Sequence, residues 1–301
     1  MSVTGITGAL KHLRIDKEST WGEWVGSGLL YIPVLGDGYT VKGKADPYDP
    51  ETGIFGYNRG PFGRLRKDIS GDLTCLLQVG YLEKLFDWGI KRSAAYEAES
   101  YSAEFRDGVQ GFRHTGLRAN TFTFAGDAEN GDLSVAFALV GKDESQISQF
   151  DIPTVTADVA TGYVDADFFQ FQDGDLLEVP DGTALGTVQA FSIEVANNLT
   201  VGPAGSDDTI IHASANRQVI TGSVTLLYEN DTEAAKLRAF TASSLDLNFN
   251  DGTTDLQVTL PKLIWTDIPR DGAQSETLIE TLNFEAEYSS GDGYAMTYTI
   301  S

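Results

Sequence analysis

The chain has 301 residues and a formal charge of −23, from 21 Lys and Arg against 44 Asp and Glu. This balance argues against a protein that grips nucleic acid through its phosphates, because such binding needs a surplus of Lys and Arg. Hydrophobic residues make up 41%, enough for a packed core, and the single cysteine excludes an intramolecular disulfide and a Cys-rich metal site. No apolar run reaches the roughly 18 residues of a membrane span.

The N-terminal stretch, Met1 to Leu13, lacks a long apolar segment, so we expect no secretory signal. The product is then expected to stay in the cytoplasm where it is made, or to leave by a route other than standard secretion. The first 22 residues are interpreted as an N-terminal arm. Residues 45–66, rich in Pro, Gly and Tyr, are interpreted as a long loop.

The acidic charge is concentrated in the later part of the chain. Residues 1–120 hold 15 Lys and Arg and 15 Asp and Glu, whereas residues 121–301 hold 6 and 29. The whole deficit, 6 − 29 = −23, therefore lies in the second range. One interpretation is a solvated acidic exterior that aids solubility, and the other is a surface that must not adhere to a polyanion.

Alternating apolar and polar residues predict a mainly β protein with one buried and one wet face per strand. Asp-Gly pairs, typical of hairpin turns, separate these segments at seven positions from Asp37-Gly38 to Asp292-Gly293. The alternating apolar sets are Phe122 and Phe124; Leu133, Val135, Phe137 and Leu139; Phe191, Ile193 and Val195; Leu245, Leu247 and Phe249; Leu256, Val258 and Leu260; and Leu282, Phe284, Ala286 and Tyr288.

Helical pattern is confined to two short segments. Residues 81–91 place Leu82, Leu85, Phe86 and Ile90 near one face. Residues 231–241 are rich in helix formers and follow a cap at Asn230 and Asp231.

The chain also repeats itself. Residues 68–77 (DISGDLTCLL) match residues 219–228 (VITGSVTLLY) at an offset of 151, and each segment precedes one of the two helices. Residues 133–142 parallel 279–288 with Phe137 opposite Phe284, and residues 31–40 parallel 191–200 more weakly. Matches in the same order predict a duplication, with domains at 1–150 and 151–301; the alternative is chance similarity among strands, which share a small alphabet.

A search for chemistry finds no candidate catalytic residues, and no cofactor or metal is predicted. His12, His114 and His212 lack metal-ligand spacing and are interpreted as surface or turn residues, while Cys75 in a strand is interpreted as a small buried hydrophobe. Glu285 and Glu287 would flank a sugar only within a cleft, which the sequence does not indicate. Two acidic loops lack the calcium-loop spacing, and turn chemistry explains them as well; they contain Asp46, Asp49 and Glu51, and Asp165, Asp167, Asp173 and Asp175.

Several stretches resemble the major tail tube proteins of long-tailed, siphovirus-type bacteriophages, in particular their tandem-domain group. The resemblance spans most of the chain, and the order of the motifs carries more weight than any one of them. Residues 45–66 match no shared element. The similar stretches are IDKESTWGEW (15–24), YIPV (31–34), ISGDLTCLL (69–77), HTGLRANTFTFAGDAENGDLSVAFALVGKD (114–143), TVQAFSIEVANNLT (187–200), RQVITGSVTLLYEN (217–230) and TLPKLIWTDIPRDG (259–272).

The resemblance implies two tail-tube-like β-sandwich or half-barrel domains, each flanked by a short helix. It implies a structural virion protein and no enzyme: three chains would form a ring with pseudo-sixfold symmetry, and stacked rings would enclose a conduit for the genome. Partners would be further copies and the tape measure, terminator and distal tail proteins, with assembly in the host cytoplasm and no membrane. An acidic lumen would let DNA slide, and its candidate residues are Asp72, Thr74, Glu285 and Glu287. The alternative is that these four residues face the outer solvent.

The N-terminal arm and residues 45–66 are the candidates for contacts between stacked rings. The alternatives that stay open are another tail component built on the same domain, such as a distal tail or terminator ring, a β-sandwich that binds glycans, and a two-domain β-rich enzyme. The last two require an aromatic-lined groove and a clustered catalytic set respectively, and the sequence indicates neither.

Overall fold

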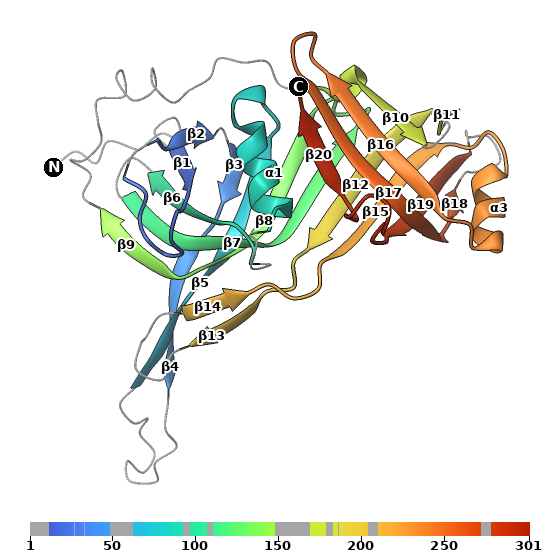
Figure 1. Cartoon of the computed structure of the whole chain (residues 1–301). Coiled ribbons are helices and arrows are strands. Elements are labelled where there is room, and N and C mark those ends of the chain that lie inside the picture. The colour runs from blue at the N-terminus through green and yellow to red at the C-terminus, as the bar shows by residue number, and fades with distance from the viewer. Residues whose placement is uncertain are drawn as a thin grey trace.

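The computed structural model describes residues 12–26, 28–32, 34–48, 63–92, 97–106, 111–147, 169–178, 183–185, 187–203, 210–271 and 278–301. Strands dominate, as predicted, and eighteen of them belong to one hydrogen-bonded antiparallel set that does not close into a barrel among these residues (Figure 1). β13 and β14 form a separate two-stranded sheet.

The first half of the chain contains nine of the described strands and one α-helix. Its helical segments are η3 (Val79–Tyr81) and α1 (Leu82–Ile90). Its strands are β1 (His12–Lys17), β2 (Leu30–Ile32), β3 (Val34–Tyr39), β4 (Lys42–Tyr48), β5 (Gly63–Leu76), β6 (Ser100–Arg106), β7 (Gly111–Asp127), β8 (Leu133–Gly141) and β9 (Asp143–Ile147).

The second half contains the other strands and a second α-helix. Its helical segments are η5 (Phe171–Asp173) and α3 (Thr232–Ala239). Its strands are β10 (Gly174–Glu178), β11 (Thr183–Ala184), β12 (Val188–Ala196), β13 (Thr200–Pro203), β14 (Ile210–Ser214), β15 (Val219–Leu227), β16 (Ser243–Asn250), β17 (Asp255–Asp267), β18 (Arg270–Asp271), β19 (Ile279–Ala286) and β20 (Thr297–Ile300).

The strands of the two halves are arranged in the same order. In the first half the order is β2–β1–β6–β7–β8–β5, with β3 and β4 along the outer side of β5. In the second half it is β11–β10–β16–β17–β19–β15–β12. α1 follows β5, and α3 follows β15.

Register irregularities also recur at corresponding places. The β6–β7 register shifts between Tyr101 and Ala103, and the β16–β17 register shifts between Ser243 and Leu245. The β7–β8 register shifts at Ala119 to Thr121, and the β17–β19 register shifts at Trp265 to Asp267. β-Bulges re-aim a strand and end its pairing, so these shared bulges bend β7 and β17 at the same point.

The pairings correct two of the alignments predicted from the sequence. Gly71 and Gly222 do occupy corresponding places, but they pair with Leu139 and Phe284, so Leu139 and not Phe137 is the counterpart of Phe284. Tyr39 pairs with Leu73, and Phe191 pairs with Val224. Leu73 and Val224 each follow the matched glycine by two residues, so Tyr39 is the counterpart of Phe191. The offset there is 191 − 39 = 152, whereas the sequence match had assumed 160.

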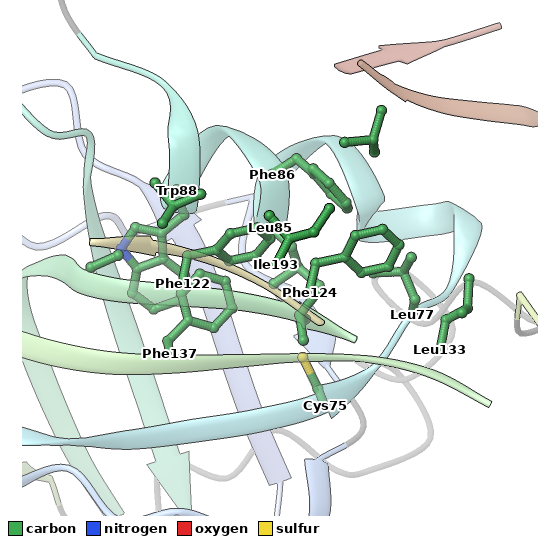
Figure 2. Close-up of a cluster of buried hydrophobic side chains, with 14 of the residues drawn as sticks. Cys75, Leu77, Leu85, Phe86, Trp88, Phe122, Phe124, Leu133, Phe137 and Ile193 are labelled. Atoms are coloured by element: carbon green, nitrogen blue, oxygen red, sulfur yellow. The ribbon is translucent and has the colours of Figure 1, made fainter. Parts of the chain in front are cut away.

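The core lies between the strands and α1, as Figure 2 shows. The helical spacing of Leu82, Leu85 and Phe86 holds, because all three are fully buried. Phe86 meets Phe122 and Phe124 edge to face, with ring centroids 5.4 and 5.5 Å apart.

The second predicted helix is also present. α3 begins after Asp231, and the backbone N–H of Thr232 donates to Oδ1 of Asn230 at 2.9 Å. The helix ends at Ala239, and the C-cap residue Phe240 adopts a left-handed conformation (φ 51°) and is 80% exposed. α3 therefore buries little apolar surface, whereas α1 is embedded in the core.

Three predicted features are corrected. Part of the N-terminal arm is strand β1, and the ends of the predicted 45–66 loop belong to the long β4–β5 hairpin that projects from the body in Figure 1. Residues 1–11 and 49–62 lie outside the described residues. The apolar alternation of the last set fails at Tyr288, which follows the end of β19 and is 65% exposed.

No helix in the described part of the chain is long and apolar enough to cross a membrane.

Candidate functional site

The sheets of the two halves are joined into one surface by β7 and β12. β12 pairs antiparallel with the C-terminal part of β7, from Ala190 opposite Asp127 to Ala196 opposite Thr121. The resulting sheet runs β5–β8–β7–β12–β15–β19 without interruption. At roughly 4.8 Å per strand spacing, these six strands span about 24 Å.

One face of this joined sheet is buried and the other is wet. Alternate residues on the buried side are apolar and include Leu73, Phe137, Phe122, Ile193 and Leu282. We call the opposite side the wet face. A row of directly paired residues crosses it, formed by Thr74, Ala136, Thr123, Glu194, Thr221 and Glu285.

The four residues predicted for a lumen all lie on the wet face. Thr74 and Glu285 are the two ends of the row just described, Asp72 precedes Thr74 by two positions on β5, and Glu287 follows Glu285 by two positions. Asp72 and Glu285 are exposed, whereas Thr74 and Glu287 are half-buried. The alternation of the strands thus brings these distant residues to one side of one sheet.

Small Thr, Ser and Ala side chains make up most of the middle of this face. Glu194, exposed on β12, adds a carboxylate between the two halves. Lys262 forms an ion pair with Glu287 at 2.6 Å. Glu194 was part of an alternating pattern in the sequence, but only the β7–β12 pairing places it in the same row as Thr74.

Asn197 fixes the junction between β7 and β12. It is 1% exposed, its backbone N–H donates to the Asn120 carbonyl at 2.8 Å, and its side-chain amide donates to the carbonyls of Gly89 and Ala119, both at 3.0 Å. Its Oδ1 accepts from Arg92 at 3.2 Å. One buried amide therefore ties the junction to the end of α1.

His114 is not the surface residue that the sequence predicted. It is 1% exposed; the Tyr39 hydroxyl lies 2.7 Å from its Nδ1, and the Glu144 carboxylate lies 3.0 Å from its Nε2. Burial lowers the pKa of His114, although Glu144 opposes this effect. A neutral ring that accepts from Tyr39 and donates to Glu144 satisfies both contacts. His212 is exposed as predicted, and the side chain of His12 lies outside the described residues.

Acidification should destabilise the fold through His114. His114 binds a proton less readily in the folded state than in the unfolded chain. Its contribution to the free energy of unfolding is therefore complete above the unfolded pKa of about 6.5 and is lost as the pH falls below that value. In urea unfolding, we expect the free energy of unfolding to decline from pH 7.5 to pH 5.5. His114 should contribute at most about 1.4 kcal/mol per pH unit to this decline. The decline should be smaller in His114→Gln than in the wild-type protein; equal declines in the two proteins would contradict it.

The described residues do not assemble a catalytic set. Cys75 is fully buried, and burial raises its pKa, in agreement with its predicted role as a small hydrophobe. A groove of about 600 Å³ between α1 and β20 is lined by Glu83, Asp87 and Tyr298 among others. The Tyr298 hydroxyl donates to Asp87, and burial together with Asp87 raises its pKa, so it stays protonated at neutral pH.

No group of His, Cys, Asp or Glu within the described ranges has a metal-binding arrangement. Of the acidic loops considered for calcium, Asp49, Glu51, Asp165 and Asp167 lie outside these ranges, as do the side chains of Asp46, Asp173 and Asp175. Trp88 and Trp265 are buried in the core.

Comparison with known families agrees with the strand-rich architecture. No curated protein sequence matches the chain. A family model described as phage tail tube protein matches residues 8–288, which include both helices, the β7–β12 junction and all four wet-face candidates. A match over nearly the whole length places this chain in the phage tail tube protein family, as a structural protein of the virion.

Proposed function

We propose that three copies of this chain form a ring with pseudo-sixfold symmetry, and that stacked rings form the tail tube through which the genome leaves the particle. The observation that carries the proposal is the strand order that occurs twice, with matching bulges. Two tandem domains, residues 1–150 and 151–301, would each occupy one of six positions in the ring. A closed ring would also cover the sheet edges that a single chain leaves exposed.

The wet face is proposed to line the channel. Its central row is made of Thr, Ala and Glu side chains, and the nearby charges are Asp72, Glu194, Glu285 and the Glu287–Lys262 pair. Carboxylates repel DNA phosphates, and short polar side chains offer no basic site to hold them. Three chains would bring 3 × −23 = −69 formal charges to each ring.

Other tail proteins would contact the two ends of such a tube, and assembly would take place in the host cytoplasm before the tail joins the particle. The N-terminal arm and the β4–β5 hairpin are proposed as contacts between rings. The hairpin projects from the body in Figure 1, so it can reach beyond its own ring.

Electron microscopy of the concentrated protein tests this function. We expect hollow tubes or stacked rings, a native mass of three chains per ring, and a reconstruction in which Glu194 and Glu285 face the channel. A monomer that never assembles, at any concentration or ionic strength, would overturn the tube. Tubes whose channel is lined by another face would overturn the proposed lumen alone.

A further inference from the structure

β7 and β17 have corresponding neighbours with one exception. The N-terminal part of β7 lies between β6 and β9, and its C-terminal part lies between β8 and β12. The N-terminal part of β17 likewise lies between β16 and β20, and its C-terminal part pairs with β19. Among the described residues, no strand takes the position beside β17 that β12 takes beside β7.

A second sheet edge is open at the other end of the joined sheet. β12 lies between β15 and β7, whereas its counterparts β3 and β4 pair with β5 on one side only within the described ranges. The Thr40 N–H donates to the Asp72 carbonyl at 3.0 Å, so the backbone of Thr40 faces β5. In a strand the backbone direction alternates, so the groups of Tyr39, Val41 and Gly43 face the open side.

We propose that these two edges pair with each other between copies of the chain, in the register of the β7–β12 junction; this inference rests on the proposed ring. Tyr39 corresponds to Phe191, as the pairings with β5 and β15 show. Asp267 corresponds to Thr121, because Asp267 directly follows the bulge in β17 and Thr121 directly follows the matching bulge in β7. The internal pairs Glu194 with Thr123 and Ala196 with Thr121 then predict Lys42 opposite Pro269 and Lys44 opposite Asp267 of the second copy.

The residue types at the two edges suit this register. Lys42 would lie near Asp267 and Asp271, so opposite charges meet across the junction. Pro269 has no N–H, but its carbonyl accepts from the Thr281 N–H at 3.0 Å, which shows that its backbone faces β19. The neighbours Ile268 and Arg270 therefore face the open edge, and the proline removes no donor from the proposed junction.

Two edge groups change partner in the proposed junction, and one of them is the Ile268 N–H, which donates to Oδ1 of Asp267 at 2.9 Å in the isolated chain. The Gly43 N–H donates to Oε2 of Glu144 at 2.8 Å in the isolated chain. In the internal junction the corresponding residue, Val195, lies opposite Phe122. Pairing with a second copy would give the Gly43 N–H a backbone carbonyl and would leave Glu144 with His114.

Disulfide trapping tests the register. Directly opposed residues of a non-hydrogen-bonded antiparallel pair have Cα atoms about 4.5 Å apart, which suits a disulfide. We expect Lys42→Cys combined with Pro269→Cys to give cross-linked oligomers up to a closed trimer after oxidation of assembled protein. An equal mixture of the two single variants should stop at dimers.

Two matched variants serve as controls. Glu194→Cys with Thr123→Cys has the same register inside one chain, so it should form an intramolecular bridge without oligomers. Lys42→Cys with Ile268→Cys directs the two side chains to opposite faces and should cross-link at least tenfold less. Tubes or rings in which the Lys42/Pro269 pair does not exceed this control would overturn the register and leave the ring intact. Protein that does not assemble would overturn both.

Discussion

Replacing Glu104 with alanine should lower the free energy of unfolding by about 3–5 kcal/mol, because it leaves buried positive charge without its partner. Glu104 is fully buried on β6, and it accepts hydrogen bonds from Arg14 on β1, Arg106 on β6 and Arg113 on β7. The Arg106 and Arg113 contacts are 2.7 and 2.9 Å long. One carboxylate thus links three adjacent strands of the first half.

The pH dependence of this cluster has a definite sign. Burial alone would raise the pKa of Glu104, but hydrogen bonds from Arg14 and Arg113 and the charges of Arg14 and Arg106 lower it overall. A carboxyl with a lowered folded-state pKa stabilises the protein above its unfolded pKa of about 4.3 and loses this contribution as the pH falls through the folded value. The difference between wild type and Glu104→Gln should therefore be constant near neutral pH and shrink below about pH 4.

Chemical unfolding followed by tryptophan fluorescence measures both effects, since Trp88 is buried in the same half. Glu287→Ala is the matched control, because it breaks an ion pair in which both side chains are 43% exposed. Exposed pairs contribute less than about 1 kcal/mol. If Glu104→Ala costs no more than Glu287→Ala, the cluster does not stabilise the fold.

Local pattern was sufficient to predict most of the elements. Alternation identified the strands around Phe122, Leu133, Ile193 and Phe284, and helical spacing identified α1, because these signals depend only on which neighbouring residues face the core. The family resemblance was also confirmed. The same alternation assigned the lumen candidates to one side of their strands, and it stays a prediction that this side lines a channel.

Features that depend on distant pairing could not be predicted. Nothing near His114 in the sequence indicates Tyr39 or Glu144, so its burial was missed. The junction of β7 with β12 is equally non-local, and with it the placement of Glu194 beside Thr123. The repeat alignment failed by two residues at Phe137 because apolar residues on one face of a strand are equivalent under a shift of two.

Gly71 and Gly222 should each resist replacement by alanine, with a cost of about 1–3 kcal/mol or more, because a neighbouring backbone occupies the space that a Cβ would need. A Cβ at Gly71 would lie 2.5 Å from Cα of Val41, and a Cβ at Gly222 would lie 2.5 Å from the Ser192 carbonyl oxygen. These two glycines were matched in the sequence at an offset of 151, and the structure gives both the same physical role.

The two substitutions should act on different junctions, which separates them from a general loss of stability. Gly71→Ala displaces the strand that carries Lys42, so it should reduce the intermolecular Lys42/Pro269 cross-link and spare the internal Glu194/Thr123 bridge. Gly222→Ala displaces β12 and should have the reverse effect.

Gly26→Ala is the matched control for this pair of variants, since no atom lies within 4 Å of its Cβ position. It should be neutral in stability and in both cross-links. If both alanine variants behave like Gly26→Ala, the chain can relax around an added methyl group, and close approach of the backbones does not explain the repeated glycine. If each variant weakens only its own junction, close packing against a glycine holds both the edge strand beside β5 and the internal strand β12 in place. The proposed equivalence of the two junctions requires this result.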